Sequence, residues 1–490
     1  MSIQNEEKRR IHERSVRMIL LLALRDVCPG AVLEIEHSIG FGVYMNVRGV
    51  SLTAAIVRRI EARMHEIVQQ DLPIEKARWS KEDAIAYFST QGQDDTVRLL
   101  SYRKFDYFNM YTCAGLSDYY YGEMAPSTGS VCDFALRLYY PGMVLLLPGD
   151  DLSAPPAPFV ERPQLMRTYA EANAHSSILQ CVSAADLNDI IAGGEARTFI
   201  RVNEALHDRA IAQIAERIVA RGARVVFVAG PSSSGKTTFA NRLGIQLRVS
   251  GKRPLAISLD DYYLNRSDVP LGPDGKPDLE CLEALDVALF NEQLVDLLAG
   301  REVELPRYSF QTKSREPKGR KLSVAEDQVL IVEGIHGLND RLSAGIPSEM
   351  KYRVYVSALT QLNLDRHNRI RTTDVRLLRR MVRDYRSRAT GVLETMEMWD
   401  KVREGEEKYI FPLQENADVM FNTSLLYEIA VLRKYAYPLL LEVGEDSPYY
   451  VRARRLVKFL NYFLDCEDEN EIPPTSILRE FVGGCTFYDH

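Results

Sequence analysis

Residues 225–243, VVFVAGPSSSGKTTFANRL, pass from a run of β-branched and apolar residues through a glycine- and serine-rich turn into a helical pattern. Residues 230–237 match the pattern G-x-x-x-x-G-K-[ST], with a strand before it and a helix after it, as that pattern requires. The backbone N–H groups of such a loop and the N-terminus of the following helix bind phosphate oxygens. The stretch therefore predicts a nucleotide-binding loop in a parallel sheet, and a turn without a ligand is the alternative.

The same pattern assigns roles to the residues of the loop. The groups expected to hold the phosphates of ATP come from Gly230, Ser232, Ser233, Ser234, Gly235, Lys236, Thr237 and Thr238. Lys236 is expected to reach the β and γ phosphates, and the Thr237 hydroxyl is expected to ligate Mg²⁺. ATP and Mg²⁺ are thus the predicted cofactors.

Acidic residues end the next two apolar strand patterns. PLAISL is followed by Asp260 and Asp261, and QVLIV is followed by Glu333. Carboxylates at the carboxyl ends of neighbouring strands lie in the crevice where such sheets bind ligands. There, Asp260 would accept a proton from an acceptor hydroxyl, and Glu333 would hold Mg²⁺ or its water shell. Caps of the following helices are the alternative role for both carboxylates.

Arginines recur three and four residues apart between residues 369 and 388, with few acids among them. On a helix this spacing places several guanidinium groups on one face, which suits a lid that closes over phosphates. A patch that binds RNA through its phosphodiesters is the alternative.

Length and composition predict more than one domain, because 490 residues with 46% hydrophobic content exceed what one core usually supports. The proline-rich segment 147–162 marks a boundary. We expect an α+β domain with Tyr-rich strands from residue 98 onward (1–150), a linker and helical connection (151–222), an α/β domain with helices on both faces of its sheet (223–425) and a helical tail (426–490).

The charge and the cysteines narrow the class of protein further. A net charge of −7 argues against a general nucleic-acid coat, and the seven cysteines form no CxxC pair. No apolar run approaches the length that spans a bilayer. We therefore expect a cytoplasmic protein that does not associate with membranes.

Five motifs of residues 223–425 resemble those of the uridine kinase and phosphoribulokinase family of P-loop kinases. They are GPSSSGKT, DDYY, YSFQTK, VEGI and RRMVRDYRSR, against GxSxSGKT, DSFY, YDFxxH, FEGI and RRxxRDxxxR in the family. The resemblance implies that Asp260 is the catalytic base, that Glu333 lies beside Mg²⁺ and that Lys236 takes part in catalysis. It further implies phosphate contacts from Arg380, Arg383 and Arg388, the last two catalytic, and nucleoside contacts from Tyr263, Tyr308, Phe310 and Lys313.

Two residues depart from the family pattern in the substrate loop. Ser309 stands where the family has Asp, and Lys313 stands where it has a His that contacts the base. A lysine cannot accept a hydrogen bond as a neutral imidazole can, so a pyrimidine would be bound differently or an anionic substrate preferred.

The first 150 residues resemble the second additional, editing domain of threonyl-tRNA synthetases. Arg14, Met18, Tyr120 and Met124 occupy the positions of the His, His, Cys and His of the hydrolytic site. Deacylation is therefore not expected, and the domain is expected to persist as a binding module. The fused order of the two domains is similar to that of a bacterial group of two-domain nucleoside kinases.

The predicted function is ATP- and Mg²⁺-dependent phosphoryl transfer to the 5′-hydroxyl of a nucleoside. A nucleotide-gated regulator that binds RNA through the synthetase-like domain is one alternative, and a kinase for a non-nucleoside small molecule is another. The choice of nucleoside, the use of ATP or GTP, the oligomeric state and the role of the N-terminal domain stay open at this point.

Overall fold

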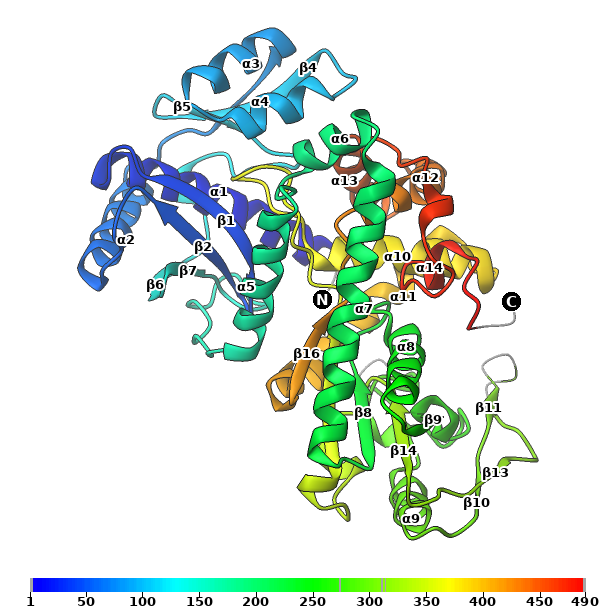
Figure 1. The fold of residues 1–490 in the computed structure, drawn as a ribbon. Coiled ribbons are helices and arrows are strands. Elements are labelled where there is room, and N and C mark those ends of the chain that lie inside the picture. Colours follow the sequence, from blue (N-terminus) through cyan, green and yellow to red (C-terminus); the bar gives the residue numbers. More distant parts are fainter. Residues whose placement is uncertain (1–2, 273–274, 310–311, 313, 488–490) are drawn as a thin grey trace.

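The computed structural model describes residues 3–272, 275–309, 312 and 314–487. A parallel five-stranded sheet lies at the centre of the region that follows residue 223 (Figure 1). Its strands are, from edge to edge, β9 (Arg253–Ser258), β14 (Gln328–Glu333), β8 (Val225–Ala229), β15 (Lys351–Ser357) and β16 (Val419–Asn422). Every pair of neighbours is parallel, which confirms the predicted sheet.

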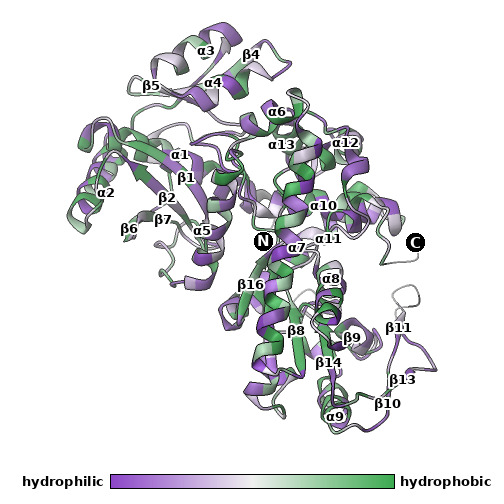
Figure 2. Cartoon of the chain, viewed as in Figure 1, coloured by the Kyte–Doolittle hydropathy of each residue, from purple (hydrophilic) through white to green (hydrophobic). Residues whose placement is uncertain are grey.

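Helices cover both faces of this sheet because its central strand is apolar on both sides. Val226 and Val228 pack in one hydrophobic cluster with α7 (Ala196–Arg221) and α8 (Lys236–Val249). Val225 and Phe227 pack in another with α9 (Val287–Leu298). The buried strands stand out as hydrophobic in Figure 2, whereas hydrophilic residues gather on the outer faces of the helices.

The N-terminal region contains two antiparallel sheets, which fits the predicted α+β domain. The larger sheet has the order β1 (Val32–Ile39), β2 (Gly42–Arg48), β7 (Gly142–Leu146) and β6 (Ala135–Tyr139), and it packs with α1 (Ile3–Val27) and α2 (Ala54–Gln69). The smaller sheet consists of β3 (Glu75–Ser80), β4 (Tyr107–Cys113) and β5 (Leu116–Tyr119), with α3 (Lys81–Thr90) and α4 (Asp94–Ser101) beside it.

The prediction of strands from residue 98 onward is wrong at its start. Residues 94–101 form α4, whose first turn carries Asp94 and Asp95. Leu99 and Leu100 are fully buried with Phe88 of α3. Acids at the start and an apolar pair on one face are typical of a short amphipathic helix, which the nearby tyrosines hid in the sequence.

The four residues for which the sequence resemblance predicted editing-site positions are packed or hydrogen-bonded side chains. Met18 is fully buried and Tyr120 is 4% exposed, both in the core of the N-terminal region, and Met124 packs against that core. Arg14 donates to the carbonyl oxygen of Glu123 at 2.8 Å. These side chains therefore contribute to the packing and hydrogen bonding of the N-terminal region.

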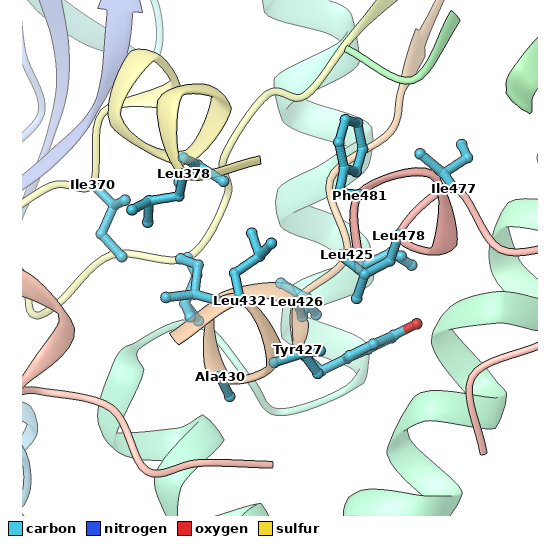
Figure 3. Close-up of a cluster of buried hydrophobic side chains, with 14 of the residues drawn as sticks. Ile370, Leu378, Leu425, Leu426, Tyr427, Ala430, Leu432, Ile477, Leu478 and Phe481 are labelled. Atoms are coloured by element: carbon cyan, nitrogen blue, oxygen red, sulfur yellow. The ribbon is translucent and has the colours of Figure 1, made fainter. Parts of the chain in front are cut away.

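The predicted helical connection consists of α5 (Pro163–Ile178), α6 (Ala184–Ala192) and α7, and the tail contains α12 (Glu428–Leu441), α13 (Tyr450–Leu460) and α14 (Arg479–Val482). Figure 3 shows side chains of the tail, among them Ile477 and Phe481, in one cluster with Leu378 of α10 (Thr372–Ser387). The tail thus shares a core with the sheet. Among the described residues, no helix has both the length and the apolar character that crossing a membrane requires.

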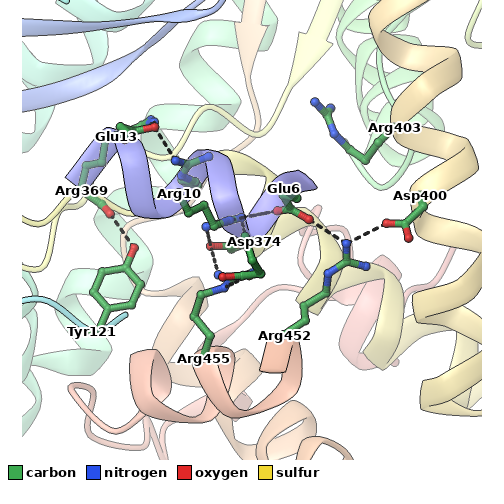
Figure 4. A network of polar contacts seen from close by, with 12 residues as sticks. Glu6, Arg10, Glu13, Tyr121, Arg369, Asp374, Asp400, Arg403, Arg452 and Arg455 are labelled. Atoms are coloured by element: carbon green, nitrogen blue, oxygen red, sulfur yellow. Dashed lines mark hydrogen bonds and ion pairs between the residues drawn. The ribbon is translucent and has the colours of Figure 1, made fainter. Parts of the chain in front are cut away.

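A buried ionic network joins the start of the chain to its last third (Figure 4). Asp374, in the first turn of α10, accepts from Arg10 Nη2 of α1 at 2.8 Å and from Arg455 Nη1 of α13 at 2.7 Å. Burial alone would raise the pKa of Asp374, but the two guanidinium groups hold it at about 2. Helix α10 is therefore fixed at its N-terminal end by charges from two distant segments.

Candidate active site

The loop 230–235 joins β8 to α8 in the manner that its sequence predicts. Gly230 is required there, because a Cβ on it would lie 2.0 Å from the carbonyl oxygen of Val356. Gly235 has a φ of +84° and caps α8, and Ser233 also adopts a positive φ of 57°. This backbone turns sharply enough to direct N–H groups inward, as phosphate-binding loops do.

Several polar groups of the loop have few partners within the protein. The hydroxyl groups of Ser233 and Ser234 are buried and hydrogen-bond to no described residue. The Lys236 ammonium donates to the carbonyl oxygen of Pro231 at 3.2 Å. Burial lowers the pKa of Lys236, and the charges of Glu333 and Asp260 oppose that shift. These groups fit a bound polyphosphate, which would supply acceptors for all of them.

The two predicted carboxylates lie at neighbouring strand ends in reach of this lysine. Asp260 follows β9, and Glu333 ends β14, where Ser258 Oγ donates to Glu333 Oε1 at 2.8 Å. Burial and the nearby charge of Asp260 raise the pKa of Glu333 to about 7. Burial also raises the pKa of Asp260, while Lys236 and Arg388 lower it. Asp260 and Glu333 are thus two partly buried acids side by side, and a nearby cation would stabilise their ionised forms.

The arginines of α10 divide into two groups. Arg376 and Arg379 are buried and bind the carboxylates of Glu406 and Glu428. Arg380, which is 8% exposed and pairs with Asp384, donates from Nη1 to Ser232 Oγ of the loop at 2.8 Å. Arg380 is thus the predicted phosphate contact of this helix that touches the loop, and the burial of Arg376 and Arg379 leaves neither free to bind RNA.

The other two predicted phosphate-binding arginines gather at the C-terminal end of α10. Asp384 accepts from Arg383 Nη2 at 2.7 Å and forms an ion pair with Arg388 Nε at 3.7 Å. The Arg388 side chain is 57% exposed, and it lies close enough to influence the charge of Asp260. Asp384, which also pairs with Arg380, thus gathers three arginines of this segment near the loop.

Two tyrosines line the predicted acceptor side. The rings of Tyr263 and Tyr308 lie 5.6 Å apart between centroids, and Tyr263 OH donates to the carbonyl oxygen of Leu279 at 3.1 Å. Phe310 and Lys313 lie outside the described residues. Tyr263 follows Asp260 by three residues, whereas Tyr308 lies in the small hairpin of β11 (Tyr308–Ser309) and β12 (Ser314–Arg315).

Two acids of the site were not identified from the sequence. Glu480 Oε2, in the tail, accepts from the Thr238 hydroxyl at 2.6 Å. Glu406 Oε1 accepts from the backbone N–H of Ser232 at 2.9 Å. The segments GEEKYIFP and PPTSILREFVGG contain these residues, but nothing local in either segment indicates a contact with a loop so far away in the chain.

The described residues contain no group of three or more His, Cys, Asp or Glu side chains that could hold a metal ion alone. Mg²⁺ in kinases is typically held by one or two side chains together with phosphates and water. Thr237, in the first turn of α8, and Glu333 fit that partial set. Their site would therefore be completed by the nucleotide.

A glycine-rich loop between a central parallel strand and a helix, with a lysine, two carboxylates and arginines above it, defines a P-loop kinase. Residues 225–425 match the Phosphoribulokinase / Uridine kinase family. This segment is a P-loop kinase domain of that family, and the protein is an ATP-dependent kinase.

Curated relatives match the same part of the chain. A uridine kinase of Proteus mirabilis is 28% identical over 199 residues, which are 40% of this chain and 85% of that protein. A uridine kinase of Pectobacterium carotovorum is 29% identical over 199 residues, with the same two shares. A solved structure described as a possible uridine kinase from Bacillus stearothermophilus is 21% identical and has a TM-score of 0.31, covering 44% of this chain and all of that chain.

Proposed function

We propose that the protein transfers the γ-phosphoryl group of ATP to the 5′-hydroxyl of a nucleoside, in the manner of a uridine or cytidine kinase. The observation that carries the proposal is the position of Asp260. Its carboxylate follows β9 beside the phosphate-binding loop, close enough to Lys236 and Arg388 for both to lower its pKa. The named activity of the curated relatives gives the acceptor class.

Different residues would act on the donor, the acceptor and the transferred group. ATP is the phosphoryl donor, and Thr237 and Glu333 would hold Mg²⁺, which would offset the charge of its phosphates. Asp260 orients the acceptor hydroxyl and takes its proton, so that the hydroxyl oxygen can form the new bond to phosphorus. Lys236, Arg383 and Arg388 stabilise the negative charge on the transferred group and on the leaving oxygen.

Separate residues would also bind the phosphates and the nucleoside. Arg380 and the loop hydroxyls orient the phosphates, because Arg380 already bonds to Ser232 Oγ. Tyr263 and Tyr308 form an aromatic wall against which the nucleoside, whose ring Phe310 and Lys313 would also contact, can pack. A small-molecule acceptor other than a nucleoside is the second candidate, favoured by Ser309 at a position where the family has Asp.

The role of the N-terminal region belongs to the same proposal. We infer that it is a synthetase-like module without hydrolytic activity, since Met18 and Tyr120 are packed in its core. The boundaries 1–150, 151–222, 223–425 and 426–490 are proposed for the four segments, within a cytoplasmic protein.

An ADP-release assay with ATP and Mg²⁺ against a panel of ribonucleosides, ribulose 5-phosphate and pantothenate tests the proposal. We expect release that depends on one nucleoside and disappears in Asp260→Asn, while that variant still binds ATP. The neighbour Asp261→Asn is the matched control and should keep its turnover. Turnover by Asp260→Asn equal to that of the unchanged protein would refute the role of this carboxylate. Release with a non-nucleoside acceptor alone would favour the second candidate.

A further inference from the structure

A cavity of about 300 Å³ lies between the N-terminal region and the kinase domain. Its walls come from α1, the turn between β1 and β2, α5, the end of β15, the start of α10 and α11 (Val392–Gly405). No residue of the loop 230–238 lines it, and neither does Asp260 or Glu333. The cavity is therefore distinct from the active site.

Six arginines and five acids lie on the wall of this cavity. The lining arginines are Arg9, Arg162, Arg369, Arg371, Arg376 and Arg403, and the lining acids are Glu6, Glu13, Asp400, Glu404 and Glu407. Most of these acids are already engaged. Glu6 and Asp400 both accept from Arg452, which is not a lining residue, at 2.7 Å (Figure 4).

Positive charge is left over after these pairs are formed. Arg9 and Arg162 donate to the carbonyl oxygens of Phe41 at 3.4 Å and Phe411 at 3.1 Å, and within the part of the chain that the structure describes neither forms an ion pair. Arg369 and Arg371 share the carboxylate of Glu13.

The charge of Arg371 shows the same excess. Burial lowers the pKa of Arg371 to about 9; the charges of Arg10 and Arg369 add to that shift, and those of Glu13 and Asp374 oppose it. A bound anion would reverse the imbalance, because an opposite charge favours the charged form of a buried cation.

Two uncharged polar groups in the cavity also have no partner. Thr360 Oγ1 and His37 Nδ1 are buried, and neither atom hydrogen-bonds to a described residue. Both residues are 6% exposed. Burial lowers the pKa of His37 to about 3, so its ring is neutral. A buried polar atom without a partner costs free energy that a polar ligand would recover.

The N-terminus of α10 adds to the attraction for anions. Thr372 and Thr373, the first two residues of this 16-residue helix, line the cavity. The positive end of the helix dipole therefore acts in the same space as the unpaired guanidinium groups. The wall also contains Trp399 and Phe411, which can cover an apolar ring or sugar.

We propose that this interdomain cavity binds a small phosphate-bearing molecule, either inorganic phosphate or a phosphate monoester of sugar size, and that its occupancy alters the ATP loop. The volume is at the lower end of that of small-molecule sites, which suits a ligand of this size. The phosphate would lie among Arg9, Arg162 and Arg371, and its hydroxyl-bearing part would face Thr360 and His37.

One side chain connects this cavity to the ATP loop. Arg376 lines the cavity, and its Nε and Nη2 donate to the carbonyl oxygen of Ser232 at 2.9 and 2.7 Å. It also binds Glu406, which accepts from the N–H of Ser232. An anion that attracts Arg376 would therefore weaken its hydrogen bonds to the carbonyl oxygen of Ser232, while Arg403 still holds Glu406 at 2.7 Å.

Equilibrium binding to the full-length protein tests the site. The probes are inorganic phosphate and ribose 5-phosphate, and Lys236→Ala is the background in which the ATP loop is impaired. We expect this background to retain one site for a probe, with an affinity at least about tenfold lower when Arg9→Met and Arg162→Met are added. Thr360→Val should weaken ribose 5-phosphate more than inorganic phosphate if the monoester is the ligand, and both equally if free phosphate is.

Arg253→Met, at an arginine of an exposed ion pair on the sheet edge, is the matched control and should bind as the background does. No binding by Lys236→Ala, or equal binding after the Arg9 and Arg162 substitutions in a protein with unchanged melting, would overturn the site. The binding measurements need no turnover, so they remain decisive even if the proposed nucleoside kinase activity fails. In the unchanged protein, a KM for ATP that does not respond to a saturating probe would overturn the coupling.

Discussion

Replacing Asp374 by asparagine would remove the charge that fixes α10 to α1 and α13. The carboxylate is 7% exposed, and its partners Arg10 and Arg455 are 2% and 4% exposed. After the substitution, both guanidinium groups stay buried with less negative charge around them. Helix α10 contains Arg380 and Arg383, two of the arginines proposed to bind phosphate, so the perturbation would act on the proposed active site from a distance.

The expected cost follows from the geometry of the network. Removing one partner of a buried ion pair costs about 3–5 kcal/mol. Arg10 keeps Glu6 at 2.6 Å and Arg455 keeps Glu7 at 2.9 Å, so we expect the lower end, about 3 kcal/mol. The lowered pKa of Asp374 gives a stabilisation of similar size, because a shift from 3.8 to about 2 corresponds to about 2 kcal/mol.

The sign of the pH dependence follows as well. A carboxyl group whose folded-state pKa is lowered stabilises the fold above the unfolded-state pKa of 3.8, and this contribution is lost as the pH falls through about 2. At neutral pH the full contribution is present, and neutral pH is where the variant should be compared with the unchanged protein.

Hydrogen exchange of the α1 amides at pH 7 measures the effect. A loss of about 3 kcal/mol corresponds to about two orders of magnitude in the opening equilibrium. Asp327→Asn is the matched control, because its pair with Arg253 is exposed at 57% and 60% and should contribute less than about 1 kcal/mol. Equal exchange of α1 in the two variants would refute the idea that Asp374 holds the segments together.

Two further perturbations probe other contacts. Burial lowers the pKa of His367, but the charge of Asp118 and its hydrogen bond raise it by more, so that the pKa lies above its usual value of 6.5. The stability from this contact between the N-terminal region and the kinase domain is therefore full below pH 6.5 and is lost as the pH rises through the folded-state pKa. Asp118→Asn should flatten the pH dependence of hydrogen exchange near residue 367, and an unchanged profile would contradict this. Glu480→Gln should lower the KM for ATP roughly severalfold, because its charge lies beside the loop that binds the phosphates. A higher KM in a titration of initial rates would show instead that the Glu480 carboxylate is needed to orient Thr238.

The sequence was most informative where the chemistry is local. The loop 230–237 contains its own glycines, lysine and threonine within eight residues, and the strand–loop–helix order around it fixes their geometry. Asp260 and Glu333 were found in the same way, since Glu333 ends β14 and Asp260 follows the end of β9 by two residues. The parallel sheet followed from the alternation of strands and helices.

Long-range partners could not be predicted from the sequence. The pattern of arginines in α10 predicted a charged helix, but not that Arg376 and Arg379 would be buried against Glu406 and Glu428. The contact of Glu480 with Thr238 joins residues 242 positions apart. Periodicity predicts which face of a helix is charged, but which acid contacts this face depends on the tertiary fold.

The position of the tail against the loop determines the smallest part of this chain that can work as an enzyme. The family match ends at residue 425, yet Ile477 Cγ2 would lie 2.5 Å from a Cβ built on Gly235. Phe481 is buried in the same cluster as residues 425–432. A fragment ending at residue 425 would keep every motif of the family and lose Ile477 and Glu480, which lie against the loop 230–238. We therefore expect the smallest active fragment to be longer than the segment that matches the family.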